Sequence, residues 1–244
     1  MKGTSFQKPF EFNLLVDGET WRQGDVITGS LIGKNHADPA AALNGVQVVL
    51  AYGDLNQVRK KDPEAFEVIS SVPVSSSGQT WKFQLDRNSP TTDKGGSLFL
   101  VYGLGETYSQ MGQLQLAVQP YTLIEDFLEI LKIQFRFVFK NQKFNKGFVE
   151  TKLSPPASKS YATVEQLLLS CRFEGESFEV RYSFAIQKVE AISGSAFDLK
   201  KLKRDFKKSY TPIQYKLLNG RINHEQMEAE IRRVLVDELG IMGI

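Results

Sequence analysis

Apolar and polar residues alternate with a period of two in segment after segment of this chain. The alternation is clearest over residues 10–16 and 178–186, where every second residue is aromatic or aliphatic. Successive side chains of a β-strand point to opposite faces, so this period is typical of a strand with one buried face. Clusters of glycine, proline, serine and asparagine separate the segments. The pattern predicts a protein built mainly from antiparallel β-sheets.

Residues 1–119 are predicted to form one β-sandwich. Turn residues, such as Asp17-Gly18 and the run Ser75–Gly78, separate the strands of this half. We expect strands over residues 10–16, 26–32, 44–52, 68–74, 81–85, 98–104 and 114–118.

After Pro120 the pattern changes to a helical one. Leu123, Phe127 and Leu131 lie on one stripe, and Thr122 precedes Glu125 by the spacing of a capping box. These features predict a short amphipathic helix at the junction of two β-rich units.

Residues 120–195 are predicted to form this linker helix and a second β-sandwich. We expect a strand over residues 133–139, a turn at residues 141–143, a strand over residues 147–153, and a hairpin that turns at Glu174-Gly175. Four strands are few for a full sandwich. Either the remaining chain completes this unit, or it contains strands that the pattern does not reveal.

Residues 196–244 are predicted to form a helical tail that packs on the second unit. Leu199, Leu202 and Phe206 have helical spacing within a basic stretch. A last helix should begin at Asn223, which has a glutamine three residues later, and end at Gly240.

Composition narrows the class of protein. The 30 basic and 28 acidic residues nearly balance, so a general nucleic-acid binder is not expected. Cys171 is the one cysteine, so an intrachain disulfide is impossible, which fits a reducing compartment. The first ten residues lack the apolar core of a secretory signal, and no apolar run is long enough to span a membrane. We therefore expect a cytoplasmic protein.

The order of elements resembles the arrestin-like superfamily. Residues 21–31, WRQGDVITGSL, resemble an early strand pair of those proteins, and Leu43–Leu50 is similar to their next strand. Closest in pattern is the bacterial sporulation-control branch. Its first sandwich also ends in a Val-x-Pro step before a short amphipathic helix, as in Val118–Pro120 and Leu123–Leu131. The resemblance covers residues 8–190 and stops before the tail.

This resemblance implies an all-β fold with a helical tail, in which two consecutive arrestin-like β-sandwich units are joined by the short amphipathic helix. It also implies a cytoplasmic, bacterial, non-enzymatic regulator, adaptor or scaffold. Such a protein would bind protein partners through sheet edges or the groove between the sandwiches. The family supplies no catalytic residues and no cofactor, so none is expected here.

Most residues of types that could act in catalysis or metal binding are expected to have structural roles. His36 and His224 lack the spacing of zinc ligands, and Cys171 lies on an apolar strand face typical of a buried, inert thiol. The segment Gly103–Glu106 has only part of a phosphate-loop pattern and is expected to be a simple loop. Trp21 and Trp81 are expected to belong to the core. An enzyme with an unfamiliar site remains a third hypothesis; it would need a deep pocket with clustered ionisable residues.

The basic stretch in the tail is the candidate binding site. One interpretation is the solvated face of an amphipathic helix. The other is a weak electrostatic contact with an anionic partner: a membrane surface, an acidic protein or, less expected, nucleic acid. The residues concerned are Lys200, Lys201, Lys203, Arg204, Lys207 and Lys208.

Overall fold

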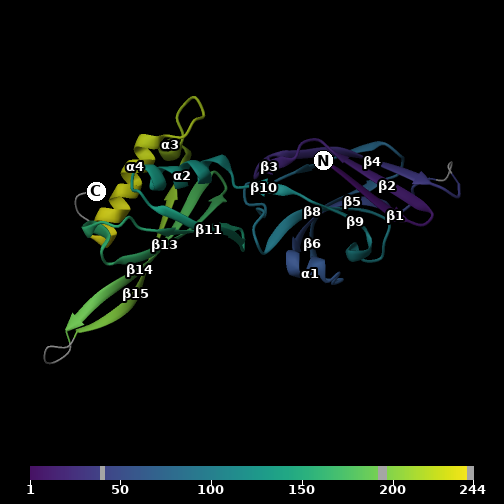
Figure 1. Cartoon of the computed structure of the whole chain (residues 1–244). Helices are drawn as coiled ribbons and strands as arrows, with labels where there is room; N and C mark the ends of the chain where they lie inside the picture. The colour runs from purple at the N-terminus through teal and green to yellow at the C-terminus, as the bar shows by residue number, and fades with distance from the viewer. Residues whose placement is uncertain (39–41, 192–196, 241–244) are drawn as a thin grey trace. The chain divides into compact units, whose positions relative to one another are not determined.

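The computed structural model describes residues 1–38, 42–191 and 197–240. The chain divides into two compact units, Met1–Pro120 and Tyr121–Ile244 (Figure 1). Each unit has a hydrophobic core of its own, so each is described by itself.

The first unit contains two four-stranded antiparallel sheets and a short parallel pair. The first sheet has the order β1 (Lys2–Gln7), β2 (Phe10–Val16), β4 (Val26–Asn35), β7 (Gln79–Gln84). The second has the order β6 (Phe66–Val74), β5 (Val46–Asp54), β8 (Gly96–Gly103), β9 (Gly112–Gln115). The remaining elements are β3 (Thr20–Arg22), which pairs with β10 (Ala117–Gln119), and the short helices α1 (Leu55–Arg59) and η1 (Tyr108–Gln110).

The core of the first unit lies between its two sheets. Phe12 and Leu31 come from one sheet, Leu50 and Leu100 come from the other, and all four are buried in the same cluster. A second, smaller cluster, which includes Phe99, covers the other face of β5 and β8. Every residue of β8 is therefore buried, which explains why its sequence is a continuous run of apolar and small residues rather than an alternating one.

The second unit contains one five-stranded antiparallel sheet within its described residues, in the order β11-β12-β13-β14-β15. Neighbours in this sheet are also neighbours in the order of strands along the chain. Its elements are α2 (Thr122–Ile133), β11 (Val138–Asn145), β12 (Phe148–Ser154), η2 (Lys159–Tyr161), β13 (Val164–Glu174), β14 (Ser177–Ala191), β15 (Phe197–Tyr210), α3 (Pro212–Tyr215), α4 (His224–Arg233) and the π-helical turn η3 (Val234–Glu238).

The layer opposite this sheet is helical, which corrects the prediction of a second β-sandwich. Phe127 on α2 and Met227 and Ile231 on α4 belong to the same buried cluster as Leu169 and Phe184 of the sheet. The helices therefore cover the apolar face of this sheet, as one sheet covers the other in the first unit. The all-β prediction with a helical tail describes the chain as a whole, but this unit pairs a sheet with helices.

The tail completes the second unit, which was one of the two alternatives left by the sequence. β15 supplies the fifth strand, and α4 supplies part of the core. The predicted last helix is confirmed. The Asn223 side chain accepts a hydrogen bond from the Gln226 amide, and Gly240 has a φ of +67° just beyond the helical residues. The other half of the predicted capping box is not formed, because the Gln226 side chain donates to Glu230.

Three local predictions were wrong. The helix α2 begins at Thr122 itself, so this residue is not the N-cap of a capping box. The strand predicted over residues 133–139 begins only at Val138. α2 continues to Ile133, and Phe135 and Phe137 are buried in the segment between α2 and β11. The turn predicted at residues 141–143 lies inside β11, and the chain turns instead at Lys146-Gly147, where both residues have positive φ.

Candidate functional site

The predicted basic helix is a strand. Residues 197–210 form β15, which pairs antiparallel with β14 from Phe178↔Tyr210 to Ala191↔Phe197. Leu202, Phe206 and Tyr210 are spaced by four, and this spacing places residues on one face of a helix and also on one face of a strand. The long register with β14 selects the strand.

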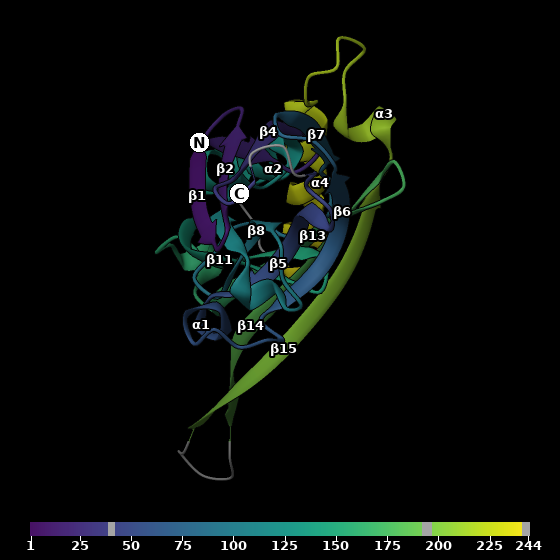
Figure 2. The same cartoon turned by 90° about the vertical axis from the view of Figure 1, so that its right-hand side faces the viewer.

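β15 ends the sheet, and β14 is its one strand neighbour among the described residues. The pairing of β14 with β13 stops at Ile186, whereas its pairing with β15 continues to Ala191. Figures 1 and 2 show this pair running beyond the other strands of the unit. In an antiparallel edge strand, alternate residues direct their N–H and C=O groups away from the sheet. β15 therefore presents a long main-chain edge.

The six predicted basic residues are divided between the two faces of the sheet, because neighbours in a strand point in opposite directions. Lys200, Arg204 and Lys208 belong to one face, and Lys201, Lys203 and Lys207 to the other. The structure thus brings these residues together along one strand, but it does not gather them into one patch.

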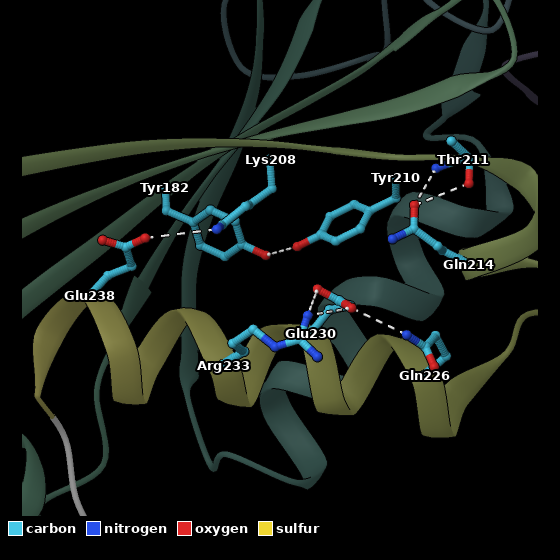
Figure 3. Close-up of polar contacts among 9 residues, drawn as sticks. All are labelled: Tyr182, Lys208, Tyr210, Thr211, Gln214, Gln226, Glu230, Arg233 and Glu238. Carbon is cyan, nitrogen blue, oxygen red and sulfur yellow. Dashed lines mark hydrogen bonds and ion pairs between the residues drawn. The ribbon is translucent and has the colours of Figure 1, made fainter.

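The face with Arg204 and Lys208 meets the helical layer. Arg204 donates from Nη1 to the carbonyl oxygen of Glu238 at 3.0 Å, and Lys208 Nζ lies 3.7 Å from the Glu238 carboxylate. Figure 3 shows the Lys208–Glu238 pair beside the end of the last helix. These contacts join the edge strand β15 to the last residue of η3.

Polar groups are paired within the sheet and within α4 where the two layers pack. The hydroxyls of Tyr182 and Tyr210 lie 2.9 Å apart in the core, and burial raises the pKa of both, so both remain neutral phenols at physiological pH. Below them, Glu230 accepts hydrogen bonds from Gln226 and Arg233 (Figure 3). The chemistry here is structural, because each polar group has a partner within the unit.

The opposite face carries a cationic cluster around one buried carboxylate, Glu179. Its oxygens lie 2.7 Å from Arg181 Nε, 3.0 Å from Arg172 Nη2 and 3.2 Å from Lys207 Nζ. Both guanidinium groups also lie over the ring of Phe148, at 4.3 and 4.5 Å. Three cations surround one anion, so this cluster has a net positive charge.

The Glu179 carboxylate stays ionised. Burial raises its pKa, but hydrogen bonds from Arg181, Arg172 and Lys207 outweigh burial and lower the pKa to about 2. Sequence reasoning missed this cluster, although a signal existed. The hairpin turns at Gly175-Glu176, one residue later than predicted, and this register places Arg172 opposite Glu179.

The other basic residues on this face also have acidic neighbours. Lys201 Nζ lies 3.4 Å from Glu165, and Lys203 Nζ lies 3.1 Å from Asp205. All four side chains are largely exposed or half-exposed, and such pairs contribute little to stability. These lysines can therefore exchange their present partners for others at little cost.

The other residues considered from the sequence lie in the cores or make local contacts. Trp21 and Trp81 are buried, as predicted, and Cys171 is buried in the second core, where burial raises its pKa. His36 lies 3.1 Å from Glu11 on the surface. Leu104, in the predicted simple loop, donates its N–H to the Gln7 side chain.

No group of three or more His, Cys, Asp or Glu side chains in residues 1–38, 42–191 and 197–240 could hold a metal ion. Within the same ranges, no helix has the length and hydrophobicity needed to cross a membrane.

Comparison with known proteins gives a likeness of fold. No family model matches the chain, and no curated protein matches it. Among solved structures, it is similar to Spo0M, a sporulation control protein from Bacillus subtilis, with a TM-score of 0.58 and 12% sequence identity. The match covers 94% of this chain and 98% of that one. The resemblance to sporulation-control proteins, predicted from sequence, is thereby confirmed at the level of the fold.

Proposed function

We propose that this chain is a non-enzymatic regulatory protein that binds a partner protein by adding an extended segment of that partner to the edge of β15. The observation that carries the proposal is the open edge of this 14-residue strand. The likeness to a protein named for sporulation control supports a regulatory role.

Main-chain pairing supplies the affinity in this kind of recognition. An extended peptide that joins a sheet edge satisfies the outward N–H and C=O groups, and side-chain contacts with alternate residues supply specificity. β15 is suited to this because it is long and already held in register by β14 along its whole length. A partner segment therefore meets an ordered template.

The charge of β15 indicates the partner's chemistry. The strand has six basic residues and two acidic ones, Asp198 and Asp205. Lysines on an edge oppose pairing with a second copy of the same edge, since like charges would face one another. An extended segment rich in Asp or Glu would instead pair favourably on both faces.

This proposal replaces the alternative of a basic helix lying on an anionic membrane. A helix could turn several lysines toward one surface, but a strand directs half of them to each side of the sheet. One flat surface cannot collect all six charges.

The test uses the full chain as bait in an extract of its native cell, with a charge-reversal variant, Lys201→Glu with Lys203→Glu. The matched control is Lys140→Glu with Lys143→Glu on β11, the other edge strand of the same sheet. We expect the β15 variant to lose the captured partner and the β11 variant to keep it.

Hydrogen exchange on the captured complex then locates the contact. We expect the partner to slow exchange of backbone amides in β15, because outward N–H groups become hydrogen-bonded. The proposal is contradicted if both charge-reversal variants still capture the partner. It is also contradicted if the partner leaves the hydrogen exchange of the β15 amides unchanged.

A further inference from the structure

The turn between α3 and α4 exposes an aliphatic tip. Leu218 is fully exposed, and Leu217 beside it is 45% exposed. Ile213, on the short helix just before, is 88% exposed. Single exposed aliphatic residues are common on protein surfaces, but three within six positions form a local concentration.

The tip is ordered. Leu217 donates its N–H to the Arg221 carbonyl at 2.7 Å, and Gly220, with a φ of +84°, donates to the Leu217 carbonyl at 2.9 Å. At its base, Tyr215 is buried and its hydroxyl donates to the Glu176 carbonyl at 2.8 Å. The leucines are thus held outward by a built turn, which extends beyond α3 and α4 in Figures 1 and 2.

The charged residues of the tip segment itself have one sign. Between Asp205 and Glu225 the chain has no acidic residue, but it has Lys216 and Arg221 directly flanking the leucines. A surface that accepts this segment must take aliphatic side chains at the tip and offer negative charge around it. An anionic lipid membrane has both properties in that arrangement, since hydrocarbon lies beneath a layer of charged headgroups.

We propose that the Leu217–Leu218 turn inserts into the interface of an anionic membrane, with Lys216 and Arg221 at the level of the headgroups. This contact uses residues other than those of the β15 edge and does not depend on the partner proposed for it. Long cationic side chains can bury their methylene groups while their charge reaches the headgroups.

Co-sedimentation of the full chain with vesicles tests the contact. The vesicles are phosphatidylcholine alone and phosphatidylcholine mixed with phosphatidylserine. We expect binding to the mixed vesicles that weakens as salt is raised. Leu217→Ser with Leu218→Ser should weaken it by at least about tenfold, since two aliphatic side chains no longer enter the interface. The control, Val68→Ser with Ile69→Ser, removes exposed aliphatic residues of β6 and should bind like the unaltered chain.

A fluorescent probe on Leu218→Cys gives an independent readout, because the native Cys171 is buried and will not be labelled. Its emission should shift to the blue with mixed vesicles, whereas a probe on Ile69→Cys should not shift. The proposal is overturned if the unaltered chain ignores mixed vesicles, or if the leucine variant binds them equally well. It is also overturned if the Leu218 probe reports burial against a protein in cell extract and none against vesicles.

Discussion

In each unit one face of a sheet is covered by a second layer, but the kind of layer differs between the two units. The first places a second sheet over it, so that Leu31 on one sheet and Leu50 on the other share a core. The second places the helices α2 and α4 over it, so that Phe127 packs among aromatic residues of the strands. The same alternating strand pattern thus serves either arrangement, and the amphipathic helices decide which one forms.

A further difference concerns the outer faces. In the first unit, a small apolar cluster with α1 covers the outer face of β5 and β8. In the second, the outer face is open to solvent and carries the charged cluster around Glu179. A sheet with one helical layer must make its other face compatible with water, and here it does so with cations around one carboxylate.

The largest expected effect tests whether the two cores are separate. Phe127→Ala should destabilise the second unit by about 3–5 kcal/mol, since a fully buried aromatic ring is replaced by a cavity. Both tryptophans, Trp21 and Trp81, belong to the core of the first unit. Their fluorescence during chemical denaturation should therefore keep its midpoint, while far-ultraviolet circular dichroism shows an earlier loss of structure.

The matched change in the first unit is Phe12→Ala, which should shift the tryptophan signal by a similar amount. If Phe127→Ala moves the tryptophan midpoint as far as Phe12→Ala does, the units unfold together and the comparison fails.

The next effect concerns the charged outer face. The pKa of Glu179 is about 2, below its ordinary value of 4.5, so the ionised carboxylate stabilises the folded state by about 3 kcal/mol. This contribution is fully present above about pH 4.5 and is lost as the pH falls toward about 2. Glu179→Gln should lower the free energy of unfolding by that amount at pH 7.

The difference in free energy of unfolding between Glu179→Gln and the unaltered chain should shrink as the pH is lowered. Denaturation at several pH values would measure it. Glu174→Gln is a suitable control, because that carboxylate is exposed and lies 4.0 Å from Arg172. A gap between Glu179→Gln and the unaltered chain that stays constant from neutral pH to pH 2 contradicts this account.

The smallest effect concerns the start of the helical layer. Asn223→Ala should cost about 1 kcal/mol, because the Gln226 amide loses the side-chain acceptor at the N-terminus of α4. Asn223→Asp keeps an acceptor and should restore most of the stability. Circular dichroism during denaturation would measure both, and equal losses for the two variants would show that the cap contributes nothing.

Predictions from sequence succeeded where local signals determine structure. The hairpin between β13 and β14 and the helix after Asn223 both follow from short motifs, and both are observed, although the hairpin turns at Gly175-Glu176, one residue later than predicted. They failed where distant pairing decides. The spacing of Leu202 and Phe206 fits a helix and a strand equally, and only the register with β14 distinguishes them.

The charged cluster around Glu179 also combines a contact set by local sequence with one set by distant pairing. The pairing of Arg172 with Glu179 follows from the hairpin register only when the turn is placed at Gly175-Glu176, because a turn at Glu174-Gly175 would set Arg172 opposite Ser177. The arrival of Lys207 at the same carboxylate requires β15 to be a strand, so it could not be deduced before that strand was known.

The chain order of the second sheet has a consequence for synthesis. Its strands can pair one after another as they leave the ribosome, because each neighbour follows directly in sequence. The cover of that sheet is different: α2 opens the unit and α4 arrives about a hundred residues later, which is several seconds of translation. During that interval α2 and the strands leave part of their apolar face without its cover. This unit should therefore need a chaperone more than the first one, until the last helix has been made.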